Sequence, residues 1–188
     1  MAVQARQNID ELLAESFKEL ACKQPIEKIT IKEITDRAGV IRPTFYHHFQ
    51  DKFELLEWII KTQILNPVSP LLQAGMIDEG LVLIFTGLLK EKEFYMHASR
   101  LEGQNSFGSI VQGCICEVLL NYMKDHEMFR APKSSWITPE HIAEYYAQSM
   151  CYIVMTWIRA GMPLSPGEMG KVYSYIIRHS MQEVLDGA

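Results

Sequence analysis

Residues 30–49, TIKEITDRAGVIRPTFYHHF, constrain the fold more than any other stretch, because they carry the start and stop signals of two successive short helices. Thr30 and Glu33 have the spacing of a capping box, in which the hydroxyl accepts from the backbone N–H of Glu33 and the carboxylate reaches back. Gly39 supplies the left-handed residue that ends the first helix. The second helix begins around Arg42-Pro43, since proline is tolerated in a first turn.

The apolar residues of this stretch fall on one side of each expected helix. Ile31, Ile34 and Ala38 share the inner face of the first helix. Phe45 and Phe49, four residues apart, share one face of the second. The other faces of the second helix carry mostly polar side chains, namely Arg42, Thr44, Tyr46, His47 and His48. Two short helices across a glycine turn, with apolar anchors beneath and polar groups outside, predict a helix-turn-helix.

Residues 38–56, AGVIRPTFYHHFQDKFELL, resemble the signature of TetR-type transcriptional regulators. In that family a three-helix DNA-binding head precedes a helical dimerisation and ligand domain. The resemblance implies an all-α chain with a DNA-binding domain at 5–65, which contains the helix-turn-helix motif at 30–49, and a helical bundle for dimerisation and ligand binding at 66–188. Residues 94–107, FYMHASRLEGQNSF, are similar to the branch that contains activators of dihydroxyacetone kinase operons.

The same resemblance implies roles for side chains of the head, with the recognition helix, about 43–49, in the major groove. Bases or nearby sugars would be contacted by Arg42, Pro43, Thr44 and His47. Phosphates would be contacted by Thr30, Tyr46, His48 and Lys52, while Lys32 fits either role. One position departs from the family: the recognition helix usually has a small polar N-cap, and this chain has Ile41, which cannot accept from the exposed N–H groups. We therefore expect water or a DNA phosphate to substitute, or a helix that is less stable alone.

Other interpretations of these residues remain open. The two short helices can instead be a helical hairpin in a core, with Arg42, His47 and His48 as solvated surface. A metal site at the two histidines is disfavoured, because adjacent helical residues point about 100° apart and do not readily close on one ion. We expect no metal and no cofactor.

The charge of the chain limits the strength of DNA binding without excluding it. The net charge is −5; residues 1–61 hold nine Lys and Arg against ten Asp and Glu, a net of −1, and the remainder holds −4. Local placement matters more than this total for a module that binds in a groove. Basic and histidine side chains cluster around the two short helices, namely Lys28, Lys32, Arg42, His47, His48 and Lys52.

The composition is that of an ordinary globular protein, with 48% hydrophobic and 22% charged residues in 188. The longest apolar stretch, 142–158, is short and contains Glu144 and Gln148, which disfavours a membrane span. The first residues lack the basic start and apolar run of a signal peptide. Four cysteines without framework spacing suggest a reducing compartment. We predict a cytoplasmic protein.

Helical periodicity continues to the end of the chain, and no segment alternates as a strand would. The first helix is expected at 5–22, with Ile9, Leu12, Leu13, Phe17 and Leu20 on its inner side. A second capping box at Asp51 and Glu54 begins a helix that links the domains, and NPVSP at 66–70 is the clearest break signal in the chain. Further helices are expected near 76–90, 92–102, 106–126, 139–160 and 166–185, the last two starting at Thr138-Pro139 and Ser165-Pro166.

The last two helices, at 139–185, are apolar on more than one face and therefore need two partners. They are either buried inside one chain or paired with a second copy. We favour a homodimer that includes Trp157 and Ile176, because a two-fold arrangement also suits a helix-turn-helix reader. Methionines and aromatic residues of the body are usually core, so a cavity is implied mainly by the resemblance. The candidate pocket residues are Phe94, His97, Trp136, Tyr146 and Met150.

These observations predict a dimeric, ligand-responsive transcriptional regulator that binds a pseudo-palindromic double-stranded DNA operator and holds a small apolar effector. The first alternative is a non-catalytic co-regulator with the same fold that acts through a protein partner, as the likeness to kinase-operon activators suggests. The second is an enzyme built on a helical bundle. We do not expect an enzyme, because the sequence has no nucleophile elbow, phosphate loop or metal-ligand cluster.

Overall fold

The computed structural model describes residues 2–125, 136–179 and 183, and within these residues all regular structure is helical. The fold is therefore all-α, as the sequence predicts. The α-helices are α1 (Ala2–Ala21), α2 (Ile31–Ala38), α3 (Arg42–His48), α4 (Lys52–Ile59), α5 (Ser69–Gln73), α6 (Ile77–Lys90), α7 (Lys92–Ala98), α8 (Phe107–Asp125), α9 (Pro139–Arg159) and α10 (Pro166–Arg178). Short 3₁₀ turns are η1 (Ile26–Lys28) and η3 (Asn66–Val68), and η2 (Ile60–Leu65) is π-helical.

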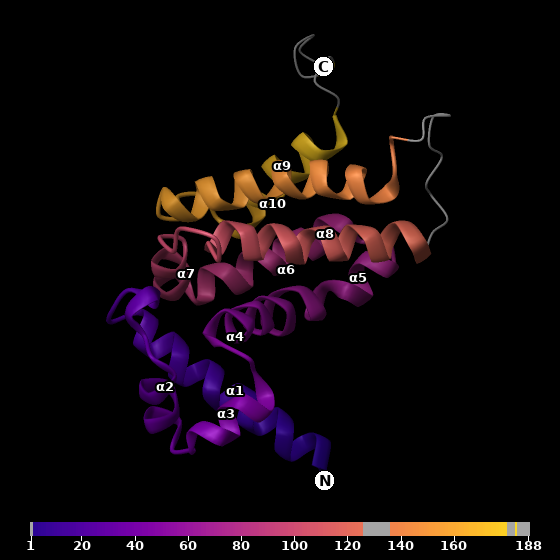
Figure 1. Ribbon diagram of the computed structural model, residues 1–188. Coiled ribbons are helices and arrows are strands. Elements are labelled where there is room, and N and C mark those ends of the chain that lie inside the picture. The colour runs from indigo at the N-terminus through magenta and orange to yellow at the C-terminus, as the bar shows by residue number, and fades with distance from the viewer. Residues whose placement is uncertain (1, 126–135, 180–182, 184–188) are drawn as a thin grey trace.

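The chain forms two groups of helices, which we call the head (α1–α4) and the body (α5–α10). In Figure 1, α1, α2 and α3 lie together at the bottom, and α4 leads from them towards the layers of the body. The segments η2 and η3 join α4 to α5. No helix of the described residues is long and apolar enough to cross a membrane.

The head is built around α1, which contacts α2, α3 and α4. Leu13 and Phe17 of α1 are completely buried, together with Ile34 of α2 and Phe45 of α3. Leu12 is the exception among the residues predicted to face inward, with 42% of its surface exposed. Since Leu13, with Phe17 four residues later, sets the buried stripe, Leu12 is rotated to its edge.

The body contains two long pairs of packed helices, α8 with α9 and α6 with α10. Its aromatic centre is Phe85 of α6, whose ring lies 5.3 Å from the ring of Trp157 and 5.5 Å from that of Tyr173, both edge to face. Such offset geometries are those that aromatic rings prefer. Helices α9 and α10 are thus tied to α6 by side chains from all three.

One predicted break is present as a change of helix type, and one predicted boundary was wrong. At NPVSP the chain passes from the π-helical η2 through the 3₁₀ turn η3 into α5, and it turns at Gly75, whose φ is 74°. The proline falls within first turns, where its missing N–H is tolerated. Helix α10 was expected to reach residue 185 but ends at Arg178, since His179 has extended dihedrals. Met181 and Leu185, two apolar positions of the expected helix, lie outside the described residues.

Head and body contact each other mainly through α1 and α7. The rings of Phe17 and Phe94 meet edge to face at 6.2 Å. Lys18 is buried, and its ammonium donates to Gln63 Oε1 of η2 and to Glu91 Oε1 before α7, both at 3.2 Å. One cation on α1 therefore binds the connecting segment and the body at once.

Candidate functional site

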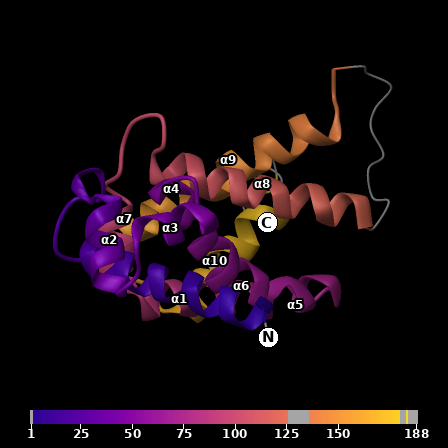
Figure 2. The same cartoon turned by 60° about the horizontal axis from the view of Figure 1, so that its bottom comes forward.

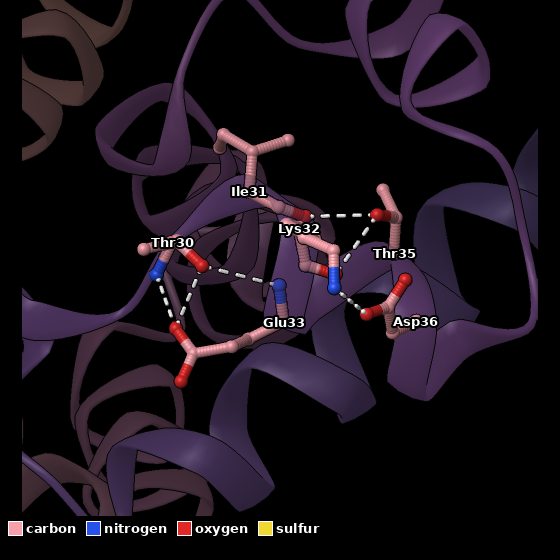
Figure 3. Close-up of polar contacts among 6 residues, drawn as sticks. All are labelled: Thr30, Ile31, Lys32, Glu33, Thr35 and Asp36. Atoms are coloured by element: carbon pink, nitrogen blue, oxygen red, sulfur yellow. Dashed lines mark hydrogen bonds and ion pairs between the residues drawn. The ribbon is translucent and has the colours of Figure 1, made fainter.

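The helix-turn-helix begins with the predicted capping box at Thr30 and Glu33, drawn in Figure 3. The backbone N–H of Glu33 donates to Thr30 Oγ1 at 3.2 Å, and the backbone N–H of Thr30 donates to Glu33 Oε2 at 2.8 Å. The bond from the Thr30 backbone holds the pKa of the Glu33 carboxyl below its ordinary value. Gly39 ends α2 with φ of 68°, as predicted. Local sequence therefore positions α2 and the turn after it.

Helix α3 is positioned by its apolar side. Phe45 is completely buried, and Phe49 packs edge to face on Trp58 of α4 at 6.0 Å. Ile41 occupies the N-cap without any side-chain hydrogen bond and is 69% exposed. The unusual N-cap therefore leaves the start of α3 uncapped at the surface, as the sequence predicts.

The outer side of α3 presents Arg42, Pro43, Tyr46 and His47, all exposed, with Thr44 partly exposed. The Arg42 guanidinium donates to the hydroxyl of Tyr46 at 3.2 Å and lies 5.9 Å from the centre of its ring. His47 makes no hydrogen bond or ion pair with any described residue. On α2, Lys32 is exposed and pairs with Asp36 at 3.0 Å (Figure 3). The side chains of α3 thus form a polar surface around the ring of Tyr46, and Lys32 adds an exposed cation on α2.

Lys52 was predicted to contact phosphate, and the structure gives it a different role. Its ammonium donates to the backbone carbonyls of Ile26, Glu27 and Ile29, at 2.7–2.8 Å. An ammonium has three donors, so all of them are used inside the protein. Burial lowers the pKa of Lys52. The side chain fastens the start of α4 to the turn before α2.

His48 was also predicted to contact phosphate, but it points inward. Its Nδ1 lies 2.5 Å from Asp10 Oδ1 of α1, and both side chains are largely buried. The next capping box is likewise only half as predicted: Asp51 accepts from the N–H groups of Phe53 and Glu54, whereas the Glu54 carboxylate accepts from the N–H of Gln50. Both pairs stabilise the head itself.

The body holds a cavity of about 200 Å³ between α6, α8, α9, α10 and the connecting segment. Its walls are apolar side chains and three tyrosines, namely Ile60, Ile64, Leu65, Val68, Leu72, Ile77, Leu81, Ile84, Phe85, Leu88, Tyr95, Phe107, Val111, Ile115, Val118, Leu119, Tyr122, Met150, Val154, Ile158, Tyr173 and Ile177. Pockets of this composition are typical small-molecule sites.

Of the five predicted pocket residues, only Met150 lines this cavity. Phe94 is buried against Phe17 at the boundary with the head, and His97 Nδ1 lies 2.8 Å from the carbonyl oxygen of Ala21. Trp136 is 75% exposed, and Tyr146 is exposed on α9. The sequence predicted correctly that apolar and aromatic residues line the cavity, but it named the wrong positions. Helical periodicity does not show which apolar face of a helix borders a cavity.

Tyr95 is the residue that sequence reasoning missed. It lines the cavity and is 1% exposed, and its hydroxyl is the buried side-chain polar atom of the described residues that has no hydrogen-bond partner. Its ring packs edge to face on Phe94 at 5.0 Å. The only sequence signal was its place beside Phe94 in an apolar helix, which predicts core rather than a site.

A shallower groove of about 170 Å³ adjoins the cavity between the connecting segment and α8. It shares four lining residues with the cavity, Leu65, Leu72, Val118 and Tyr122. Its polar rim includes Lys61, which pairs with Glu57 at 2.8 Å and with Glu117 at 2.5 Å. Within the described residues no group of His, Cys, Asp and Glu has the arrangement of a metal site.

Comparisons with known proteins cover both the head and the body. Residues 16–59 match the tetR family of bacterial regulatory proteins, and residues 76–179 match a family described as the transcriptional regulator C-terminal region. Over 179 residues the chain is 25% identical to the HTH-type dhaKLM operon transcriptional activator DhaS of Lactococcus lactis subsp. lactis, which covers 93% of this chain and 89% of the relative.

Solved structures share the fold over nearly the whole chain. The dihydroxyacetone kinase operon activator DhaS has a TM-score of 0.56 at 24% identity and covers 90% of this chain and 92% of its own. NalD, the secondary repressor of the MexAB-OprM multidrug efflux pump in Pseudomonas aeruginosa, has a TM-score of 0.59 at 16% identity, covering 92% and 96%. Thermus thermophilus FadR, a transcriptional repressor in complex with lauroyl-CoA, has 0.55 at 17%, covering 92% and 94%.

The helix-turn-helix geometry of the head, the all-α body and the two family matches agree. The chain belongs to the TetR family of transcriptional regulators.

Proposed function

We propose that this regulator binds an operator as a homodimer, with α3 of each copy in the major groove. Residues 5–65 act as the DNA-binding unit, and residues 66–188 serve dimerisation and effector binding. The observation that carries the proposal is the division of α3 into two sides: Phe45 is buried, while Arg42 and His47 are presented outward. A helix held in this way can enter a groove about 12 Å wide without unpacking its own core.

The exposed side chains divide into base-reading and positioning groups. Arg42 carries a planar fork that suits guanine O6 and N7, the commonest specific contact in the major groove. Pro43, Thr44 and His47 would meet base edges or nearby sugars. Tyr46 would offer its hydroxyl to a phosphate, and its contact with Arg42 orients both side chains beforehand. Thr30 and Lys32, both exposed at the start of α2, complete the phosphate contacts.

Dimerisation would use the outer faces of α9 and α10. Tyr145 and Tyr152 of α9 and Ile176 of α10 are large, exposed side chains of the body. Trp157, which we had expected at the interface, is buried, and its indole N–H donates to the carbonyl of Leu164. Ile176→Glu should therefore convert dimers into folded monomers in sedimentation. Trp157→Glu should unfold the body instead.

Effector response would follow from occupation of the body cavity. The cavity wall includes Ile60 and Ile64 of η2, and η2 also carries Gln63, which accepts from Lys18 of the head. A ligand that binds one arrangement of this segment better would shift the population of dimer shapes and the separation of the two heads.

The test of DNA binding is selection of operators from a random pool with purified protein. On the selected operator, Arg42→Ala should cost roughly 1–3 kcal/mol and relax the preference at one base pair of each half-site. Arg37→Ala is the matched control, because Arg37 lies on α2 but pairs with Glu19 of α1. Equal losses for both variants would contradict the proposed role of Arg42.

A second function has one observation in its favour. His48 and Lys52 are committed to internal contacts, so the head presents fewer free cations than its sequence suggests. This favours a co-regulator that reaches DNA through a protein partner. Failure of the pool selection to enrich any site would favour the co-regulator over the DNA-binding dimer.

A further inference from the structure

The body cavity selects against charge. None of its lining residues carries an ionisable acid or base other than tyrosine. A carboxylate or ammonium inside it would lose its hydration without gaining a partner, at a large cost in free energy. Lys61, on the rim of the adjoining groove, does not change this, because Glu57 and Glu117 already neutralise it.

The cavity is long and narrow. Its wall on α8 runs from Phe107 through Val111, Ile115 and Val118 to Tyr122. These residues span four turns of the helix, or about 22 Å at 1.5 Å per residue. The remaining walls extend from α7 at one end to α5 at the other, which lie at opposite ends of the body in both views (Figures 1 and 2). A cavity of about 150 Å³ holds benzene, so about 200 Å³ over this length fits an extended, slender molecule.

One polar group is available at the α7 end. The Tyr95 hydroxyl is buried without a hydrogen-bond partner, and a buried donor without a partner is unfavourable. Burial, assisted by the nearby charge of Glu91, raises the pKa of Tyr95, so the phenol keeps its proton and acts as a donor. What this site lacks is one hydrogen-bond acceptor.

On the basis of the effector site proposed above, we propose that the cavity binds a neutral medium-chain aliphatic carbonyl compound, such as a ketone or an ester. Its chain lies along α8, and its carbonyl oxygen accepts from the hydroxyl of Tyr95. The length of the cavity, the absence of charge in its wall and the unpaired hydroxyl of Tyr95 each constrain the ligand. Together they exclude fatty acids and amines and prefer a carbonyl compound over a hydrocarbon of the same shape.

The experiment measures binding directly, without DNA, by calorimetry and by intrinsic tryptophan fluorescence, to which Trp157 contributes; its ring contacts Phe85 of the cavity wall. The probes are 2-octanone, its isosteric alkene 2-methyl-1-octene, and octanoate. Wild-type protein should bind the ketone roughly 2- to 12-fold more tightly than the alkene, the ratio expected for one hydrogen bond. Octanoate should bind more weakly than either.

Tyr95→Phe keeps the shape of the ring and removes the donor. It should reverse the preference, with the ketone weaker than the alkene and the alkene affinity unchanged, because the buried carbonyl then loses its hydrogen bonds to water without replacement. Tyr173→Phe, at the other buried tyrosine of the cavity, is the matched control and should keep the preference for the ketone. Equal affinities in wild-type protein, a preference that survives Tyr95→Phe, or strongest binding of octanoate would each overturn the proposal.

The outcome also separates ligand class from effector function. If the ketone binds through Tyr95 but leaves operator affinity unchanged, the ligand class stands and the regulatory role is wrong. If the selected operator binds through Arg42 and none of the three probes binds the body, the ligand class is wrong and the DNA-binding role stands.

Discussion

The head and the body contain similar apolar residues, but the head is closely packed whereas the body encloses a cavity. In the head, aromatic rings fill the centre: Phe45 lies 5.9 Å from Phe49, and Phe49 packs on Trp58. In the body, Phe85 is also surrounded by rings, yet a cavity of about 200 Å³ remains beside it. A closely packed unit keeps one shape, whereas a unit with a void can adopt a second packing at a modest cost. Presentation of α3 needs the first property, and response to a ligand needs the second.

Polar groups follow the same division. Two polar side chains of the head are satisfied internally: Lys52 places all three of its donors on backbone carbonyls, and His48 lies against Asp10. The body leaves the Tyr95 hydroxyl buried and unpaired. The unpaired hydroxyl and the unfilled space thus lie in the same part of the body, where we propose that a ligand binds.

The largest expected effect comes from removing an anchor of the recognition helix. Phe45→Ala should reduce the free energy of unfolding by about 3–5 kcal/mol, because the closely packed head cannot collapse into the space left. Chemical denaturation followed by circular dichroism measures this loss. Tyr46→Ala, at the exposed neighbour, is the control and should change stability little. If the two variants were equally stable, the description of the head as closely packed would be wrong.

The next effect tests the difference in packing directly. Ala14→Leu adds bulk at a completely buried position of α1 and should cost about 1–3 kcal/mol. Val111→Leu adds a methylene at the cavity wall, where space exists, and should be neutral or stabilising. Both are measured as changes in the free energy of unfolding. A Val111→Leu variant as destabilised as Ala14→Leu would mean that no usable space lies beside α8.

A comparable effect distinguishes Lys52 from Arg42 in the head. Lys52→Met leaves three carbonyls without their donor and should cost roughly 1–3 kcal/mol of stability. Arg42→Ala, at an exposed site, should stay within about 0.5 kcal/mol of wild type. Thermal and chemical unfolding of the free protein give both values. Should Lys52→Met instead leave stability intact and lower the salt dependence of DNA binding, the original phosphate role of Lys52 would be restored.

The smallest effect is a pH dependence shared by head and body. Hydrogen bonds in the capping boxes hold the pKa values of Glu33 in α2 and Glu168 in α10 below their ordinary value. This stabilisation is fully present above the ordinary glutamate pKa of about 4.3. It is lost as the pH falls through the lowered values of the folded state. Acid titration of stability should therefore be shallower for Glu33→Gln, which keeps a neutral acceptor, than for wild type. If the stability of Glu33→Gln fell with decreasing pH as steeply as that of wild type, the proposed contribution of the Glu33 carboxylate would be wrong.

Sequence reasoning succeeded where the signal was local. The capping box at Thr30, the left-handed turn at Gly39 and the apolar anchor at Phe45 follow from neighbouring residues, and all are present in the structure. The same reasoning placed the starts of α9 and α10 correctly, because Thr138 and Ser165 each precede a proline. Local chemistry fixes such features before any tertiary contact forms.

It failed where partners are distant along the chain. Lys52 bonds to carbonyls 23 to 26 residues earlier, and His48 bonds to Asp10, 38 residues earlier. The sequence around Lys52 or His48 does not show that the side chain is used inside the protein, because its partners come close only when α1, η1 and α4 have packed together. The cavity is even harder to predict from the sequence, because no residue pattern encodes an unfilled space. Tyr95 has the sequence pattern of an ordinary core residue.

The π-helical segment η2 carries a consequence for how the two units can move. A π turn closes its hydrogen bonds between residues i and i+5, so it holds more residues per turn than an α turn. If η2 rewound to the α-helical 3.6 residues per turn, each of its residues would advance further around the axis, and the residues beyond it would rotate relative to α4. That rotation would carry Ile64 away from the cavity wall and Gln63 away from Lys18 together. A change in the helical winding of η2 would therefore rotate the body relative to the head.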